Sequence, residues 1–252
     1  MERRKTALVT GAAAGIGAGI ASRFAEAGFA IAIFDTDGKG ATRMAKQLGD
    51  QNSAIAIQGD VSNEEDTRRA VETTIAKFER LDVLVNNAGI EVSGSVTSLT
   101  SAEWDRQLAV NLRGVYLMSK YSIPNMRERG GAIVNISSVH AFVSWPDCAA
   151  YDATKSGIIG LTRAMALDHG REHIRVNAIC PGYIETPFMD RWLSTLPNRE
   201  ETLAQVRSFH PLGHIGTPRD VAEAAFFLAS EAASFISGTY LVVDGAMTTA
   251  GH

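Results

Sequence analysis

Residues 5–17 read KTALVTGAAAGIG, and this stretch decides the fold of the chain. Its first six residues form a short apolar run that is typical of a buried strand. A glycine turn follows at once, and apolar residues at helical spacing continue from Ile16 to Ala27. A strand, a glycine turn and a helix are the context in which main-chain amides bind a pyrophosphate. The sequence therefore predicts a dinucleotide site at Gly11, Gly15, Ile16 and Gly17.

A second apolar run, residues 30–34, ends at Asp35. An acidic residue about 20 positions beyond the glycine turn is placed to accept hydrogen bonds from the adenosine ribose. The same carboxylate repels a 2′-phosphate, and Ala13 and Ala14 provide no basic side chain to bind one. This position predicts NAD rather than NADP as the cofactor.

Strands and helices are predicted to alternate along the rest of the chain. Further strands are expected at residues 54–58, 82–86, 132–137, 174–180 and 240–243. Helices are expected at 62–78 and 100–126, both opened by capping boxes, and at 149–169 and 217–230. The pattern predicts one α/β domain over residues 1–252, a Rossmann-type doubly wound parallel sheet of about seven strands with helices on both faces. The proline-interrupted segment 186–216 is the least regular and is expected to cover the substrate.

Composition excludes several other classes of protein. The chain has 252 residues, 45% of them hydrophobic, with a net charge of −4, so no basic surface for nucleic acid is expected. No apolar run is long enough to span a membrane, and residues 1–5 leave no room for a signal peptide before the first strand. Two cysteines do not form a disulfide framework, and two free thiols indicate a cytoplasmic protein.

Tyr151 and Lys155 are the candidate acid/base pair. Four residues apart on a predicted helix, they lie on one helical face. A tyrosine hydroxyl titrates near ~10, and a neighbouring ammonium is expected to lower that pKa. The pair is therefore suited to exchange a proton with an alcohol or a carbonyl.

The carboxyl ends of parallel strands bring the other polar residues to the same crevice. The stretches that follow these strand ends are Asp60, Asn87 to Glu91, Ser138 to Trp145 and Pro181 to Thr186. The helix that carries Tyr151 is expected to open into this crevice as well.

Seven motifs together resemble the short-chain dehydrogenase/reductase family, and the resemblance covers essentially the whole chain. They are Thr10-Gly11-x-x-x-Gly15-Ile16-Gly17, Asp60-Val61, Asn86-Asn87-Ala88-Gly89, Asn111, Ser138, Tyr151-x-x-x-Lys155 and Pro181-Gly182. The resemblance implies an oxidoreductase of the EC 1.1.1 type that interconverts a secondary alcohol and a carbonyl. It also implies that Tyr151 is the acid/base and that Lys155 lowers its pKa and holds the nicotinamide ribose.

The family pattern assigns the remaining site residues. Ser138, favoured over Ser137, would bond the reacting oxygen. Asn111 would support a water-linked proton path, although a helix-interior asparagine also bonds to nearby backbone. Asn87 would line the cofactor floor or serve only a turn. Asp60 and Val61 would border the adenine, and the nicotinamide end would meet Pro181, Ile184 and Thr186. The chain departs from the pattern at Asp152, where a small residue is more usual.

Glu91, His140 and Trp145 narrow the substrate. Their positions resemble those of the sugar 1-dehydrogenases of the family, such as glucose 1-dehydrogenase. A carboxylate and an imidazole can bind several hydroxyls, and Trp145 can stack on a sugar face. Both polar residues can equally be ordinary loop residues. The substrate predicted here is an aldose or related polyol, oxidised to a lactone.

Two other functions stay open. One is an NAD(P)H-dependent reductase of ketones or 3-oxoacyl groups, and the other is a non-catalytic nucleotide-sensing regulator. Arg191, Trp192 and His210 either read an anionic or bulky group or face solvent. The six histidines show no metal-ligand spacing, so no metal is expected. The resemblance implies a homotetramer whose only other partner is a small-molecule substrate.

Overall fold

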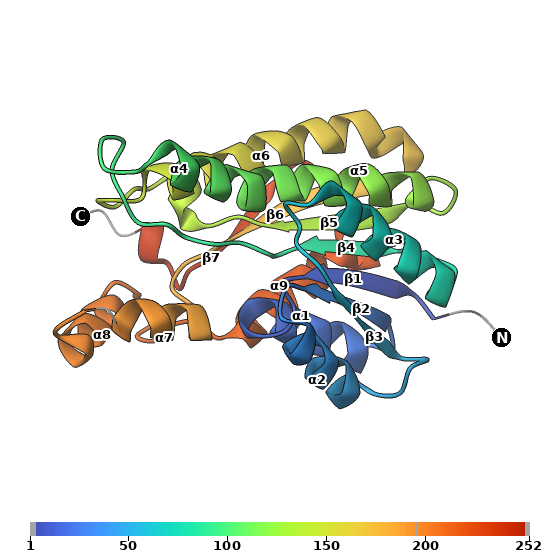
Figure 1. Cartoon of the computed structure of the whole chain (residues 1–252), viewed down its shortest axis with the longest axis horizontal. Helices are drawn as coiled ribbons and strands as arrows, with labels where there is room; N and C mark the ends of the chain where they lie inside the picture. The colour runs from blue at the N-terminus through green and yellow to red at the C-terminus, as the bar shows by residue number, and fades with distance from the viewer. Residues whose placement is uncertain (1–3, 195, 250–252) are drawn as a thin grey trace.

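A parallel sheet lies between two layers of helices in the computed structural model, which describes residues 4–194 and 196–249 (Figure 1). The first three residues, on which part of the signal-peptide prediction rests, are outside the described part. The sheet order is β3-β2-β1-β4-β5-β6-β7, and every neighbouring pair is parallel. Its strands are β1 (Thr6–Thr10), β2 (Ala30–Asp35), β3 (Ala54–Gln58), β4 (Val83–Asn86), β5 (Gly131–Ile136), β6 (Ile174–Pro181) and β7 (Tyr240–Val243). The predicted seven-stranded, Rossmann-type fold is confirmed.

Strand β1 is buried at all five positions because helices cover both faces of the sheet. This double burial explains why its sequence is a continuous apolar run rather than an alternating one. One face carries α1 (Gly15–Glu26), α2 (Gly38–Leu48) and α9 (Pro218–Ala229). The other carries α3 (Glu64–Phe78), α4 (Ser101–Leu108), α5 (Gly114–Met126) and α6 (Ala149–His169). Phe24 lies in the core of the first face and Phe34 in that of the second.

Helix α3 begins one residue later than the predicted capping box at Ser62 to Glu65. Asn63 is its N-cap, and the side-chain oxygen accepts hydrogen bonds from the amides of Glu65 and Asp66. Ser62 instead donates its hydroxyl to Asp60, at 2.7 Å. The predicted position of the cap was therefore wrong, because Ser62 is committed to a loop. The capping box at Thr100 is confirmed.

The long helix predicted from 100 to 126 is interrupted at its centre. A π-helical turn, Ala109–Arg113, separates α4 from α5 and contains Asn111. Such turns widen the helix by one residue and are frequent at functional sites. The distortion faces the loop that follows β4, so it places Asn111 against that loop.

Three helices were missed by the sequence analysis. Helix α2 has two glycines, Gly38 and Gly40, in its first turn, so its sequence does not resemble the start of a helix. The exception is the N-cap Asp37, whose carboxylate accepts a hydrogen bond from the amide of Gly40. Helices α7 (Pro187–Ser194) and α8 (Arg199–Ser208) lie in the segment predicted as least regular. Pro187 begins α7 rather than interrupting a helix, since a first-turn proline loses no hydrogen bond. The α7–α8 segment projects beyond the carboxyl ends of the strands (Figure 1).

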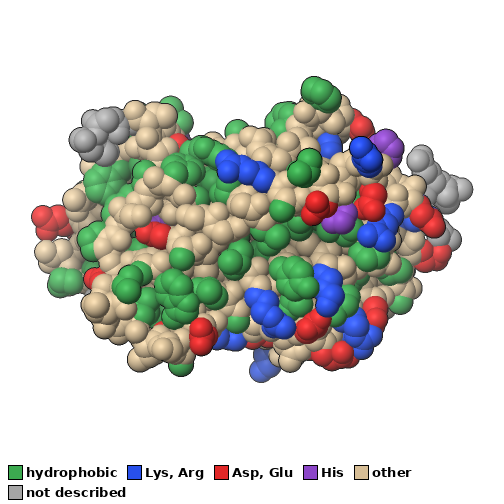
Figure 2. Space-filling view, turned by 90° about the horizontal axis from the view of Figure 1, so that it is seen from above, with side chains coloured by type: hydrophobic (Ala, Val, Ile, Leu, Met, Phe, Trp, Pro, Cys, Tyr) green, Lys and Arg blue, Asp and Glu red, His purple; other side chains and the backbone are tan. Residues whose placement is uncertain are grey.

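Several apolar side chains remain exposed on the outer surfaces. Tyr116 on α5 and Leu167 on α6 are 48% and 84% exposed, and at the open edge of the sheet Tyr240 stacks on Phe142. Figure 2 shows the helical layer from outside, with hydrophobic side chains gathered towards one end and charged ones towards the other. Among the described residues, no helix is both long and apolar enough to cross a membrane.

Candidate active site

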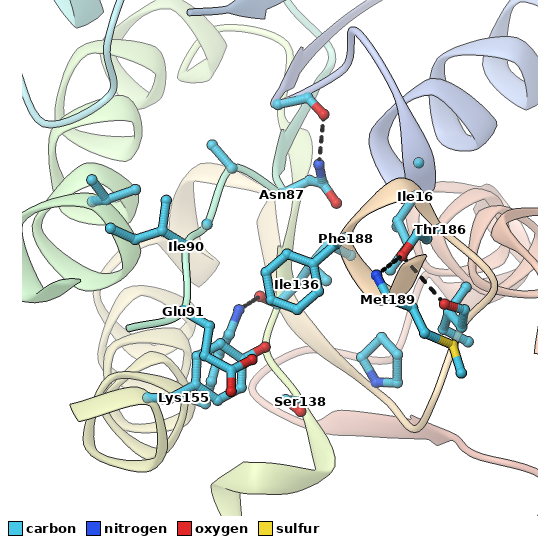
Figure 3. A pocket seen from close by; sticks show the side chains of 18 of the residues that line it. Ile16, Asn87, Ile90, Glu91, Ile136, Ser138, Lys155, Thr186, Phe188 and Met189 are labelled. Carbon is cyan, nitrogen blue, oxygen red and sulfur yellow. Dashed lines mark hydrogen bonds between the residues drawn. The ribbon is translucent and has the colours of Figure 1, made fainter. Parts of the chain in front are cut away.

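A cavity of about 760 Å³ follows the carboxyl ends of the strands. Figure 3 shows side chains from the loop after β4 on one side and from α7 on the other, with Ser138 below them. The cavity brings together nearly all the predicted site residues. They are Gly11, Gly15, Ile16, Asp35, Asp60, Val61, Asn87, Glu91, Ser138, His140, Trp145, Tyr151, Lys155, Pro181, Ile184 and Thr186. Gly17 and Asn111 are not among the residues that line it.

The glycine turn is built so that its backbone approaches the cavity closely. Gly11 and Gly15 have φ angles of 63° and 59°, a backbone conformation that residues with a side chain rarely adopt. A Cβ at Gly17 would lie 2.3 Å from the carbonyl oxygen of Gly11. Gly17 therefore packs the helix against the turn rather than lining the site. The turn fits a pyrophosphate, because its glycines and alanines leave the main chain open to the cavity.

Asn87 and Thr10 join the glycine turn to the loop after β4. The Thr10 hydroxyl accepts hydrogen bonds from the amides of Asn87 and Ala88, at 2.9 and 3.0 Å. The Asn87 side chain donates to the carbonyls of Thr10 and Gly11, at 2.9 and 3.0 Å. Asn87 thus lines the cavity and also stabilises a turn, and its contact with a cofactor stays a prediction.

Two carboxylates stand at the end of β2. Asp35 accepts hydrogen bonds from the amides of Ala13 and Asp37, both at 2.9 Å, so its position is fixed. Asp37, which sequence reasoning missed, also lines the cavity. The feature of the sequence that could have identified Asp37 is its position two residues beyond Asp35.

Asp60 is held at the next strand end. Burial opposes its ionisation, but hydrogen bonds from Ser62 and from Arg106 outweigh burial and lower the pKa of Asp60. Arg106, from α4, lines the same end of the cavity and was not predicted. Val61 packs against Gly114 at the start of α5.

Tyr151 and Lys155 lie in the first two turns of α6. The Lys155 ammonium donates to the carbonyl of Ile136 at 3.0 Å and lies 5.3 Å from the centroid of the Tyr151 ring. The Ser137 hydroxyl donates a hydrogen bond to the Lys155 carbonyl at 2.8 Å, so its proton is already used in a structural contact. Ser138 lies within hydrogen-bonding reach of the Tyr151 hydroxyl. The geometry therefore favours Ser138, as predicted, for contact with a reacting oxygen.

The predicted lowering of the tyrosine pKa is wrong for this environment. Burial, followed by the charge of Glu91, raises the pKa of Tyr151 well above its usual value, and the hydrogen bond of Ser138 offsets only part of the rise. Burial also lowers the pKa of Lys155 to about 8. The site thus holds Tyr151 as a neutral phenol, a proton donor, near neutral pH.

Asn111 lies behind the cavity rather than in it. Its side chain accepts from the amide of Ile90 and donates to the Ile90 carbonyl, both at 2.8 Å. It also donates to the Thr154 hydroxyl at 3.3 Å. Asn111 therefore fixes the loop that carries Glu91 and ties it to α6. Its part in a water-linked proton path stays a prediction.

Glu91, His140 and Trp145 meet beside Tyr151. The His140 ring lies 4.6 Å from Trp145 and 5.1 Å from Tyr151 between ring centroids. Glu91 is half-buried, and burial raises its pKa, a rise that His140 would oppose when its ring is protonated. His140 also pairs with Asp152, at 2.5 Å between Nδ1 and Oδ1. The three predicted substrate residues therefore form one cluster.

The α7 helix closes the other side of the cavity. Phe188, Met189, Arg191 and Trp192 line it, and Trp192 stacks on Tyr183 with ring centroids 6.0 Å apart. Nothing in the spacing of these residues identified Phe188 or Met189 as lining residues. His210, for which the sequence left open either substrate contact or exposure to solvent, is buried and does not line the cavity. Its Nδ1 lies 2.8 Å from the carbonyl oxygen of Val206.

Within the part of the chain that the structure describes, one group of side chains has the composition of a metal site. The ligand atoms of His140, Cys148 and Asp152 all lie within 4.8 Å of one another. Two of these residues are joined by a hydrogen bond, and the Cys148 thiol donates to the carbonyl of Pro146 at 3.5 Å. Hydrogen bonding thus accounts for the cluster.

Comparisons with known proteins agree with this geometry. Residues 11–248 match a family model described as enoyl-(acyl carrier protein) reductase. A 3beta-hydroxysteroid dehydrogenase 1 from Eggerthella lenta is 38% identical, with 97% of this chain and 94% of that protein covered. Among solved structures, a 3-ketoacyl-(acyl-carrier-protein) reductase from Brucella melitensis complexed with NADH is 39% identical, with a TM-score of 0.89 and coverage of 98% and 99%. The ligand-free aldohexose dehydrogenase of Thermoplasma acidophilum is 37% identical, with a TM-score of 0.90 and coverage of 99% and 96%.

The fold, the serine, tyrosine and lysine in one cavity, and these matches define an oxidoreductase of the nicotinamide dinucleotide type. The chain belongs to the short-chain dehydrogenase/reductase family. Because the three similar proteins have names that refer to different substrates, the substrate has to be argued from this chain's own cavity.

The charge of Glu91 predicts a change in the pH profile of catalysis. A neighbouring carboxylate disfavours the phenolate, so Glu91→Gln lowers the pKa of Tyr151. In alcohol oxidation, which needs the phenolate, the acidic limb of the kcat profile is expected to move to lower pH by roughly half a unit to one unit. Glu128→Gln, on an exposed surface, is the control. An unchanged or higher midpoint in Glu91→Gln would contradict the electrostatic coupling.

Proposed function

We propose that the protein is an NAD-dependent dehydrogenase that oxidises an aldose or related polyol, with an aldose giving the lactone. The observation that carries the proposal is the cluster of Glu91 and His140 beside Tyr151, inside the cavity. These two side chains supply hydrogen-bonding groups that an apolar substrate would leave unpaired. A partly buried carboxylate without a partner is unfavourable, so a substrate with several hydroxyls suits the site best.

The residues that would hold NAD form a continuous surface. The glycine turn offers main-chain amides to the pyrophosphate, and Asp35 offers a carboxylate to the adenosine ribose. At the other end the nicotinamide would lie near Pro181, Ile184 and Thr186. When bound, the dinucleotide supplies the hydride acceptor for oxidation.

The remaining chemistry belongs to the chain itself. In oxidation, the phenolate form of Tyr151 accepts the proton of the substrate hydroxyl. In reduction, the neutral phenol of Tyr151 donates that proton to the carbonyl oxygen. Lys155, whose ammonium lies 5.3 Å from the centroid of the Tyr151 ring, would hold the nicotinamide ribose. Ser138 bonds the reacting oxygen and keeps it within reach of Tyr151. Trp145, packed on His140, offers a flat apolar surface for one face of a sugar ring.

The segment 186–216 is part of the proposal. Met189, from its first helix, lies across the cavity from Glu91 (Figure 3), and Trp192 of the same helix also lines the cavity. Apolar side chains here would exclude water from a bound substrate, which would strengthen the hydrogen bonds and charges there. We propose that the segment covers the substrate when it is bound.

A reductase of ketones or 3-oxoacyl groups is the second candidate. The raised pKa of Tyr151 favours the neutral phenol, which is the proton donor that a reductase needs. Phe188 and Met189 also give the cavity an apolar side that suits an acyl chain. The half-buried charge of Glu91 argues against this reading. A regulator without chemistry is disfavoured because Ser138, Tyr151 and Lys155 are all in place.

Tyr151→Phe tests the acid/base role. The change removes the hydroxyl but keeps the ring that packs on His140, so binding of NAD, measured by fluorescence titration, is expected to persist. Turnover is expected to fall by about 10³-fold or more, since proton transfer in the transition state is lost. Lys155→Ala is expected to reduce both turnover and affinity for NAD. Retention of a tenth of the wild-type rate in Tyr151→Phe would remove Tyr151 from its role.

Cofactor choice depends on the charge at the end of β2. The wild-type protein is expected to prefer NAD over NADP, because Asp35 and Asp37 line the end of the cavity where the adenosine ribose would bind. Asp35→Ala is expected to reduce the ratio of the two kcat/KM values about tenfold. Asp105→Ala, on an exposed face of α4, should leave the ratio unchanged. Equal efficiency with the two cofactors in the wild type would defeat this assignment.

A panel of aldoses, polyols, steroids and simple ketones tests the substrate class. Absorbance of the reduced nicotinamide is expected to rise with NAD and at least one aldose or polyol. Glu91→Ala and His140→Ala should each reduce kcat/KM for the sugar by about tenfold or more, while the KM for NAD changes less than threefold. If only apolar alcohols or ketones react, the reductase reading replaces the proposal.

We also propose that the protein assembles as a homotetramer. The support is the exposed apolar surface of α5 and α6 and the stacked aromatic pair at the edge of β7. Open sheet edges and apolar faces of this kind are usually covered. Light scattering at micromolar concentration is expected to give four times the mass of the 27.0 kDa chain. Leu167→Glu should shift the mass downwards, and a wild-type monomer would exclude the assembly.

A further inference from the structure

Asp152 directly follows the catalytic tyrosine and contacts a residue of the substrate cluster. Its Oδ1 lies 2.5 Å from Nδ1 of His140, and the two side chains are only 19% and 17% exposed. The contact links the start of α6 to the short helix Val139–Ala141 after β5.

The contact decides which ring nitrogen of His140 carries the proton. An ionised carboxylate only accepts hydrogen bonds, so the nitrogen facing Asp152 must be the donor. Nδ1 is therefore protonated in the neutral ring, and Nε2 is left with a lone pair. Trp145 and Tyr151 pack against the ring at 4.6 and 5.1 Å between centroids, which limits its rotation. The imidazole is thus held in one tautomer and one orientation.

We propose that Asp152 is a positioning residue that fixes His140 as a hydrogen-bond acceptor and so selects substrates with hydroxyl donors. This inference rests on the proposed function and refines it. Glu91 is also an acceptor when ionised, so the substrate end presents two acceptors close to Tyr151. A substrate fills both only if it carries two hydroxyls besides the one that reacts. A ketone with an apolar chain fills neither.

Three other charged or titratable groups face this pair. Glu91 interacts with both residues through its charge, Tyr151 packs against the imidazole, and Cys148 lies beside Asp152. Their presence means that removing the Asp152 carboxylate also alters the field at Tyr151. A test of positioning must therefore separate charge from the hydrogen bond.

Asp152→Asn makes that separation, because the amide oxygen still accepts from Nδ1 while the charge is lost. Asp152→Ala removes both and introduces a small residue. We expect Asp152→Ala to raise the KM for the best polyol about tenfold, with kcat and the KM for NAD changed less than threefold. Asp152→Asn is expected to stay within threefold of the wild type. Assays contain EDTA, since the ligand atoms of His140, Cys148 and Asp152 lie within 4.8 Å of one another.

A double-mutant cycle asks whether Asp152 acts through His140. In a His140→Ala background, Asp152→Ala is expected to have no further effect on the KM for the substrate, because the group it positions is gone. Independent, multiplicative effects of the two changes would overturn the proposal. Equal losses in Asp152→Asn and Asp152→Ala would overturn it as well, since charge alone would then explain the effect.

Nitrogen-15 NMR of the histidine rings supplies a readout that needs no substrate. The His140 signals, assigned by their loss in His140→Gln, are expected to show Nδ1 protonated in the wild-type protein. In Asp152→Ala they should move towards the Nε2-protonated form. A wild-type ring protonated at Nε2 would overturn the positioning role. If the His140 tautomer is as expected but the protein oxidises no polyol of the substrate panel, the proposed function fails and the positioning role stands. The double-mutant cycle is then measured with the best substrate that the panel identifies.

Discussion

The hydrogen bonds between Thr10, Asn87 and the glycine turn hold the ends of β1 and β4 at one fixed separation. Thr10 uses its hydroxyl and its carbonyl for this, and Asn87 uses its backbone and its side chain. The cofactor turn and the loop that carries Glu91 are therefore parts of one hydrogen-bonded unit. Because Asn111 binds the same loop from behind, the position of Glu91 is determined from both sides. The geometry of the substrate end follows from these few polar contacts within an apolar sheet.

The electrostatics of the site are dominated by negative groups around a buried lysine. Glu91 and Asp152 both oppose ionisation of Tyr151, and burial lowers the pKa of Lys155 to about 8. An isolated tyrosine here is a poor base. These carboxylates disfavour the phenolate that oxidation needs, and the proposed function assigns them to recognition of the substrate. Recognition and proton transfer therefore place opposite demands on the same few side chains.

The fold was predictable because the strands are short, mostly apolar runs, and β1 to β4 each end in a polar residue. The cofactor residues were predictable for the same reason, since a parallel sheet collects its strand ends at one edge. What sequence reasoning missed depends on three-dimensional packing. Helix α2 begins with Gly38, a poor helix former, and its cap Asp37 is the one local signal. The pKa of Tyr151 was predicted in the wrong direction because burial cannot be read from a Tyr-x-x-x-Lys spacing. The pairing of His140 with Asp152 joins a loop to a helix, and no periodicity indicates it.

The segment between Ile184 and Gly216 leaves the sheet and returns to its point of departure. Main-chain hydrogen bonds join Glu185 to Gly216 and Gly216 to Tyr183, at 2.8 and 3.0 Å, and Met189, Leu193 and Val206 form a small apolar cluster of its own. The entropy of closing such a loop depends only weakly on its length. Insertions and exchanges within it are therefore expected to leave the melting temperature of the sheet almost unchanged. If this segment covers the substrate, as proposed, it would be an exchangeable module through which one catalytic framework could acquire new substrates without being rebuilt.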